Sequence, residues 1–237
     1  MCPICDVNGV SRRGFLALAS AGIASGLFAA SNAAWAASDG APTNLTADQA
    51  LARLMTGNER YTKAPDVCAN NLIRQRDEVA KHQAPWATIL SCADSRVPPE
   101  LLFGGGELFV ARNAGNMVDT ATMGTIEYGS AVLGVPLIVV LGHERCGAVA
   151  AAVDTFEKQA EFPGSIGPMV GAIVPAVQAA KGKPGDLLDN AVRESASVSA
   201  RHLATGSPLI ADLVTKGKVK VVAACYDLDN GKVEWLA

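Results

Sequence analysis

Three side chains that bind soft metal ions stand in two short segments of the sequence. Cys92 belongs to the first segment, and His143 and Cys146 stand three residues apart in the second. Two thiolates and one imidazole are typical ligands of Zn²⁺. A structural zinc site is usually closed by four protein ligands, whereas a catalytic site keeps three and leaves the fourth position to water or substrate. These residues therefore predict a catalytic site that holds one Zn²⁺ per chain.

Asp94 and Arg96 follow Cys92 closely and would bring charge to the predicted zinc site. Zinc bound by two thiolates and a neutral imidazole is formally neutral, so it acidifies a bound water less than a three-histidine zinc centre does. A nearby carboxylate compensates when it accepts the remaining proton of the bound hydroxide and orients the nucleophile. Arg96 can hold Asp94 in place by a charge-assisted pair. The alternative is a surface ion pair of little energetic value, but the position beside a metal ligand favours a catalytic dyad.

The predicted ligands stand at the ends of predicted strands. Short apolar runs at residues 87–91, 108–112 and 137–142 alternate with longer helical segments, which indicates a parallel sheet of the βαβ type. Sites in open α/β sheets form outside the carboxyl ends of strands, so we expect the ligands at 92 and 143 to converge there. The third ligand comes from the first turn of a helix that begins near Cys146, where the helix N-terminus favours thiolate over thiol.

The remaining elements complete an α/β fold, with a central, mostly parallel β-sheet flanked by helices, an N-terminal helical arm and a C-terminal β-hairpin. The arm begins with a capping box of Thr46 and Gln49. Its apolar residues Leu51, Leu54 and Met55 have no partner within the arm, so we expect them to pack on a second subunit in a homodimer or higher homo-oligomer. Packing on the arm's own sheet is the alternative. Further elements are expected at residues 71–81, 117–133 and 186–205 (helices) and at 219–225 and 232–236 (hairpin strands, with a turn at 229–231).

Residues 1–36 have the pattern of an export signal. Arg12 and Arg13 precede a mildly apolar run, and the sequence Ala-Trp-Ala at 34–36 supplies small residues at the positions that a signal peptidase reads. The pattern resembles a twin-arginine signal cleaved after residue 36, and it predicts export to the periplasm by the twin-arginine machinery. A retained membrane anchor is the alternative, which the shortness of the run and its Gly and Ser content disfavour.

The composition of the chain limits its class and its partners. The 237 residues are 49% hydrophobic and have a formal net charge of −3. This content allows a real core, and residues 37–237 are expected to form a single zinc-enzyme domain. No cluster of Lys and Arg interleaved with aromatic residues occurs, so nucleic acid is not expected as a partner. Cys68 and Cys225 either pair as a disulfide after export or stay reduced, with Cys225 as a small buried hydrophobe.

The segments Ser91–Val97 and Gly142–Gly147 resemble the zinc-binding signature of β-class carbonic anhydrases, and the likeness extends from about residue 45 to residue 235. The resemblance implies that Cys92, His143 and Cys146 bind zinc and that Asp94 and Arg96 form a dyad. In some members the aspartate takes the fourth zinc position in a closed state, so Asp94 is a possible fourth ligand. Some relatives also have an allosteric bicarbonate site with a Trp three residues before the first Cys ligand. This chain has Ile89 there, and no such site is expected.

The function that this resemblance implies is the reversible hydration of carbon dioxide to bicarbonate and a proton. Hydrolysis of carbonyl sulfide or carbon disulfide on the same scaffold is one alternative. A zinc-binding module without catalysis is another, although the intact Asp94 and Arg96 argue against it. His82 and His202 could each relay protons near neutral pH, but His202 falls on the apolar stripe of its predicted helix and is expected to be packed.

Overall fold

The computed structural model describes residues 41–70, 79–80, 82–105 and 107–236. The predicted export signal and most of the predicted helix at 71–81 lie outside the described residues. Among the helices that are described, none combines the length and the apolar character needed to cross a bilayer.

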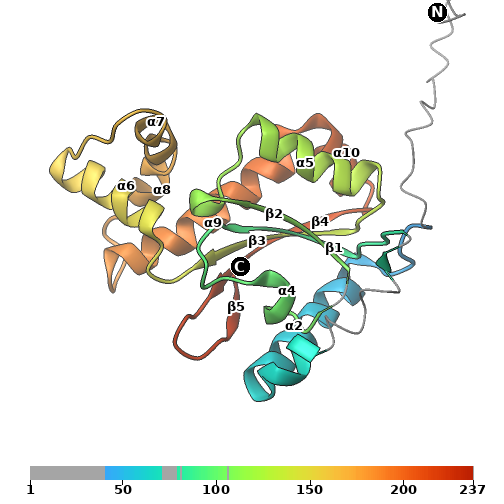
Figure 1. Cartoon of the computed structure of the whole chain (residues 1–237). Coiled ribbons are helices and arrows are strands. Elements are labelled where there is room, and N and C mark those ends of the chain that lie inside the picture. Colours follow the sequence, from blue (N-terminus) through green and yellow to red (C-terminus); the bar gives the residue numbers. More distant parts are fainter. Residues whose placement is uncertain (1–40, 71–78, 81, 106, 237) are drawn as a thin grey trace, which may run out of the picture. The chain divides into compact units, whose positions relative to one another are not determined.

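Five strands form one sheet in the order β2-β1-β3-β4-β5 (Figure 1). The first four pair in parallel, and β5 pairs with β4 in antiparallel orientation. The α/β prediction, with its mostly parallel sheet and C-terminal hairpin, is therefore confirmed. The strands are β1 (Ala87–Cys92), β2 (Leu108–Asn113), β3 (Leu137–His143), β4 (Lys220–Tyr226) and β5 (Val233–Leu236).

The order of the strands places the two strand-end ligands side by side. From β1 the chain moves first to β2 on one side and then to β3 on the other. Every residue of β1 and of β3 is buried, as expected for apolar strands covered on both faces. The crevice that such a reversal opens lies at the carboxyl ends of β1 and β3, where Cys92 and His143 stand.

Helices cover both faces of the sheet. On one face α2 and α4 pack with residues of β1 and β3 in one apolar cluster. On the other face α5, α9 and α10 pack on the sheet, and α6 to α8 pack around the end of β1 (Figure 1). The helical elements are α2 (Ala47–Lys63), α4 (Pro99–Leu102), the 3₁₀ turn η1 (Ala114–Asn116), α5 (Thr120–Ala131), α6 (Gly147–Lys158), α7 (Ile166–Gly171), α8 (Val174–Ala180), α9 (Leu187–Gly206) and α10 (Pro208–Thr215).

One helix begins later than the sequence predicted, because a turn and a cap precede it. The helix expected at 117–133 is preceded by η1 and begins only at Thr120, since the Asp119 carboxylate accepts a hydrogen bond from the Thr122 backbone N–H at 2.7 Å. The helix expected at 186–205 is confirmed as α9, which Asp186 caps. Pro208 then begins α10 at its first position.

The predicted capping box at Thr46 and Gln49 is present, but the apolar side of α2 has its partner within the same chain. Leu54 is fully buried and Leu51 packs against the same cluster, which includes Trp86, Leu102 and Phe103 of this chain, while Met55 remains 45% exposed. The expectation that this stripe needs a second subunit was therefore wrong for Leu54. These packing partners are distant in sequence, so the sequence of the arm alone did not show that its apolar side would be covered.

The close approach of α2 to the loop after α4 yields a prediction. A Cβ added at Gly57 would lie 2.1 Å from the backbone oxygen of Phe103, whereas one added at Gly124 in α5 would meet nothing within 4 Å. We expect Gly57→Ala to lower the free energy of unfolding by about 2 kcal/mol or more through overpacking. Gly124→Ala should raise it by about 0.5 kcal/mol, because the helix interior prefers alanine. Urea unfolding measures both, and equal midpoints for Gly57→Ala and the parent protein would contradict the packing described.

Candidate metal centre

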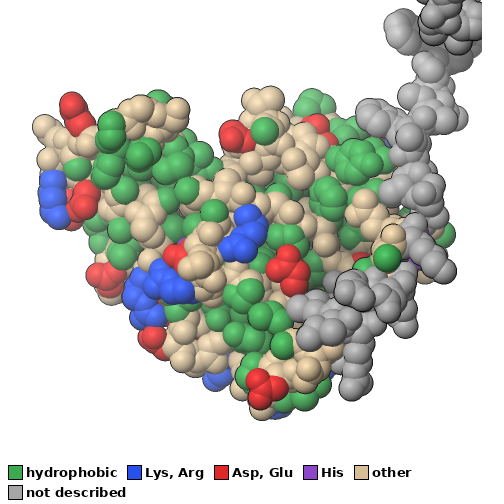
Figure 2. Space-filling model, in the orientation of Figure 1, with side chains coloured by type: hydrophobic (Ala, Val, Ile, Leu, Met, Phe, Trp, Pro, Cys, Tyr) green, Lys and Arg blue, Asp and Glu red, His purple; other side chains and the backbone are tan. Residues whose placement is uncertain are grey.

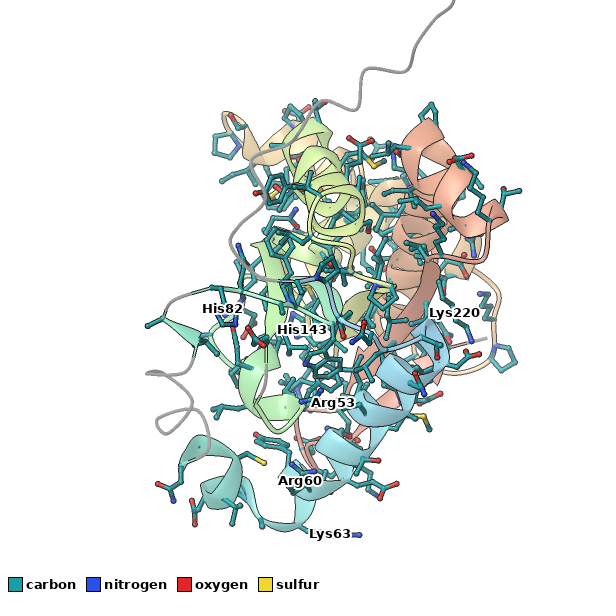
Figure 3. All side chains as sticks on the ribbon, turned by 90° about the vertical axis from the view of Figure 1, so that its right-hand side faces the viewer. Arg53, Arg60, Lys63, His82, His143 and Lys220 are labelled. Atoms are coloured by element: carbon teal, nitrogen blue, oxygen red, sulfur yellow. The ribbon has the colours of Figure 1, made fainter. Side chains whose placement is uncertain are left out.

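The three predicted zinc ligands come together in the structure. The Sγ atoms of Cys92 and Cys146 are 3.9 Å apart, and the ligand atoms of Cys92, His143 and Cys146 all lie within 4.8 Å of one another. All three residues are buried. Figure 3 shows His143 among the packed side chains of the interior, with His82 farther out toward the side of the molecule.

The donor atoms fit a zinc ion. Two thiolates about 2.3 Å from one tetrahedral zinc ion stand about 3.8 Å apart, close to the separation found. The Nδ1 atom of His143 lies 2.9 Å from the backbone oxygen of Glu144, to which it donates. The Nε2 atom is buried and has no hydrogen-bond partner among the described residues. This arrangement leaves the Nε2 lone pair free for a metal and fixes the tautomer that a zinc-binding histidine needs.

Each ligand is positioned by the end of a regular element. Cys92 is the last residue of β1, and His143 is the last residue of β3. Cys146 caps α6, which begins at Gly147, as the sequence predicted. Arg145, between the two ligands of this segment, has a left-handed backbone with φ of 52°, a conformation that is uncommon for a residue other than glycine. This bend returns the chain toward β1, so Cys146 faces Cys92.

The two thiols share one proton when no metal is present. A hydrogen bond from Cys146 lowers the pKa of Cys92 to about 4, with help from His143 and the Gly115 N–H. The adjacent Cys92 thiolate, and then burial, raise the pKa of Cys146, although the Ala148 and Val149 N–H groups at the start of α6 act in the opposite direction. The start of α6 therefore favours a thiolate at Cys146, as its position predicted, but the neighbouring Cys92 outweighs this effect.

Asp94 and Arg96 form the predicted pair, and its geometry is bidentate. Arg96 donates from Nε to Oδ1 at 2.9 Å and from Nη2 to Oδ2 at 2.8 Å, and its backbone N–H also donates to Oδ1 at 2.9 Å. These contacts hold the pKa of Asp94 well below its usual range, so the carboxylate stays ionised at neutral pH. It faces Arg96 and is not part of the cluster of ligand atoms.

Arg112 and Gly115 take part in the site, although the sequence analysis did not single them out. Arg112, at the end of β2, donates to the backbone oxygen of Cys92 at 2.9 Å and to that of Asp94 at 2.6 Å. The Gly115 backbone N–H donates to the Cys92 sulfur at 3.4 Å. An arginine that closes an otherwise apolar strand was the signal available in the sequence. Together these groups fix the segment that carries the first ligand and the dyad.

His202 does not have the packed position predicted for it. It is exposed, as is His82. It lies beside a depression lined by Asp119 and Ser199, among other residues of the segment between η1 and α5, of α5 and of α9. The buried stripe of α9 consists mainly of small residues, and position 202 lies at its edge. This stripe comprises Ala191, Val192, Ser195, Ala196, Ser199, Ala200 and Leu203.

Comparison with known proteins agrees with this geometry. Residues 87–233 match the family model described as carbonic anhydrase. Carbonic anhydrase 2 of Mycobacterium tuberculosis is 35% identical over 181 residues, which cover 76% of this chain and 87% of the relative. The chain belongs to the β-class carbonic anhydrase family. A carbonic anhydrase of Mycolicibacterium smegmatis is 33% identical over 183 residues, covering 76% of this chain and 89% of the relative.

Solved structures of β-carbonic anhydrases share the fold. A Coccomyxa β-carbonic anhydrase in complex with acetazolamide is 28% identical, has a TM-score of 0.61, and is matched over 75% of this chain and 83% of its own. A tetrameric β-carbonic anhydrase from the ascomycete Sordaria macrospora has a TM-score of 0.61 at 22% identity, over 76% of this chain and 96% of its own. The sheet and helices that position the metal centre are therefore those of the family.

Removal of one ligand tests the centre. We expect Cys146→Ser to lose bound zinc, because a hydroxyl is a much poorer zinc ligand than a thiolate. Cys225→Ser is the matched control, since Cys225 is also a buried free cysteine but lies outside the ligand cluster. Metal analysis of the purified proteins should find about one zinc per chain in the control and almost none in Cys146→Ser. Stoichiometric zinc in Cys146→Ser would show that Cys146 is not a zinc ligand.

Acid should weaken zinc binding. Zinc must displace the proton held by Cys146, whose pKa is raised, whereas Cys92 is already a thiolate above pH 4 or so. Release of one proton on binding makes the zinc affinity about tenfold weaker for each unit by which pH falls. Competition with a chromophoric chelator between pH 6 and pH 8 measures this slope. An affinity independent of pH would mean that the site is fully deprotonated before zinc arrives.

Proposed function

We propose that the protein is a zinc-dependent carbonic anhydrase that interconverts carbon dioxide with bicarbonate and a proton. The observation that carries the proposal is the open set of three ligands, Cys92, His143 and Cys146, beside an ionised Asp94. Four protein ligands would suffice for a structural ion, whereas three leave a position for water. Membership in the β-class family supports the same activity.

Different residues would bind the metal and orient the nucleophile. Cys92, His143 Nε2 and Cys146 would hold zinc, and the chemistry that the ion supplies when bound is Lewis-acid activation of water near neutral pH. Asp94 Oδ1 accepts two hydrogen bonds from Arg96, whereas Oδ2 accepts only one. Oδ2 therefore keeps free acceptor capacity, and we assign to it the hydrogen bond that orients the nucleophile toward carbon dioxide.

Arg96 has two effects on Asp94. It keeps the carboxylate ionised by lowering its pKa, and it keeps the carboxylate turned away from the metal ligands. Arg112 holds the backbone on either side of Ala93, so the carboxylate and the first ligand keep a fixed relation. Without Arg96, Asp94 would be free to take the fourth zinc position and close the site.

Export to the periplasm is part of the proposal. Arg12 and Arg13, the apolar run and the Ala-Trp-Ala sequence at 34–36 support a twin-arginine signal that is cleaved after residue 36. The twin-arginine route carries folded proteins, so the thiolates would receive zinc in the reducing cytoplasm before export. Cys68 and Cys225 are both free and buried in the structure, which agrees with the reduced alternative and with Cys225 as a small buried side chain.

A homodimer or higher homo-oligomer is also proposed. A tetrameric β-carbonic anhydrase shares the fold, and Figure 2 shows hydrophobic side chains on the surface over α5 and over the α6 to α8 region. Tyr128 of α5 and Ile166 of α7 are the large apolar residues there, 39% and 47% exposed. These faces support contact with a second copy better than the stripe of α2, which is already covered.

The dyad provides the test of the mechanism. With Asp94→Ala we expect full zinc content and a hydration rate lower by about 100-fold, because a positioned proton acceptor typically contributes 10²–10⁴-fold. With Arg96→Ala we expect full zinc and weak hydration across the pH range, because Asp94 would lose the partner that holds it away from the metal ligands. Stopped-flow hydration of carbon dioxide and metal analysis provide the two measurements.

A matched control is Asp212→Ala, which removes an exposed ion pair with Lys216 on α10 and should leave both quantities unchanged. Near-normal hydration in zinc-loaded Asp94→Ala would show that the dyad is only an ion pair, and the mechanism would be abandoned. Rapid turnover of carbonyl sulfide or carbon disulfide, with no hydration of carbon dioxide, would favour the alternative hydrolase on the same ligands.

A further inference from the structure

The segment His143–Cys146, here called the ligand loop, is bound to the turn between β4 and β5. The Glu144 backbone N–H donates to the backbone oxygen of Tyr226 at 3.0 Å, and its carboxylate accepts from the Leu228 N–H at 3.1 Å. Arg145 donates to both carboxylate oxygens of Asp229, at 3.0 and 2.7 Å. The loop that supplies two of the three zinc ligands is therefore fastened to a turn far along the chain.

The turn itself is ordered, so it offers a fixed anchor. Asp227 Oδ1 accepts hydrogen bonds from the backbone N–H groups of Asp229 and Asn230 at 2.8 and 3.2 Å. Asn58 of α2 donates to the Gly231 backbone oxygen at 2.9 Å and accepts from the Val233 N–H at 2.9 Å. Asp229 therefore presents its carboxylate to Arg145 from a turn that is hydrogen-bonded within itself and to α2.

Arg145 connects this anchor with the reaction centre. Its side chain binds Asp229, its left-handed backbone turns the ligand loop, and its backbone oxygen accepts a hydrogen bond from Arg96 Nη2 at 3.4 Å. Arg145 thus touches both the turn and the cation of the dyad. The carboxylates of Glu144, Asp227 and Asp229 lie close together, but the Arg145 guanidinium pairs with two of them, which favours a clamp over a second cation site.

We propose that Asp229 is a positioning residue of the metal centre: its bidentate pair with Arg145 holds the ligand loop in the bend that presents Cys146 to zinc and the Arg145 carbonyl to Arg96. The inference rests on the proposed zinc site. An ion pair as exposed as this one contributes little to global stability, since the Asp229 side chain is 73% exposed. Its effect is instead local, because both hydrogen bonds act on one residue of the loop.

The experiment uses the zinc-loaded protein and three variants. Asp229→Asn removes the charge and one acceptor while keeping the size of the side chain. Arg145→Gly also breaks the pair, but glycine adopts the left-handed backbone without strain. Glu234→Gln is the control. Glu234 lies on β5 of the same hairpin and forms an ion pair with Arg193 of α9 at 2.8 Å. The substitution breaks this pair without touching the ligand loop.

We expect Asp229→Asn and Arg145→Gly each to release zinc to a chelator about ten times faster than the parent protein, the low end of the effect of outer partners of metal ligands. The double variant should be no worse than either single variant, since the two residues act as one pair. The value of kcat should fall by a similar factor with little change in KM, because the dyad is displaced. Thermal unfolding midpoints should stay close to that of the parent.

Three results would overturn the proposal. Zinc release at the parent rate in Asp229→Asn would show that the pair does not position the loop. Additive losses in the double variant would show that Arg145 and Asp229 act separately. An equal loss in Glu234→Gln would show a general effect of loosening the hairpin. Because zinc release is measured directly, these results remain distinct from a failure of the proposed carbon dioxide hydration, which would appear in the parent protein itself.

Discussion

The parallel pairing of β1 with β3 is the constraint on which the centre depends. Its register places Ser91 opposite Leu141, so Cys92 and His143 leave the sheet together at its carboxyl edge. Both strands are wholly buried, and a shift of one residue would turn every side chain of a strand to the opposite face. Such a shift would force each side chain into a packing site shaped for another residue, so the packed core fixes the register, and the register in turn fixes the distance between two candidate zinc ligands.

Local patterns in the sequence were enough to predict the sheet, the capping box of α2 and the cluster of three candidate ligands. Strand ends and soft ligands coincide at Cys92 and His143, which made the metal centre predictable. Arg112 and the clamp between Arg145 and Asp229 were missed because their partners are distant in sequence and bind backbone or exposed groups, which leave no periodic signal. The burial of Leu54 and the exposure of His202 were missed for the same reason: both depend on which elements meet in three dimensions.

The charge state of the thiols shows a different limit of sequence reasoning. The start of α6 does favour a thiolate at Cys146, as its position predicted, but the effect of the neighbouring Cys92 is larger. A helix end contributes a fraction of a charge, whereas a thiolate 3.9 Å away contributes a whole one in a buried setting. Only the distance between the two sulfur atoms decides which effect prevails, and that distance is a property of the fold.

The anchoring of the ligand loop has a consequence for biosynthesis. Arg145 lies 84 positions before Asp229, and Asn58 lies 173 positions before Gly231. A ribosome makes the chain from its N-terminus, so all three metal ligands emerge well before the turn that steadies them. Contacts of such long sequence separation form slowly, because the entropy of closing a long loop opposes them. With the proposed clamp, the metal centre reaches its final geometry only after β5 has been synthesised and paired with β4.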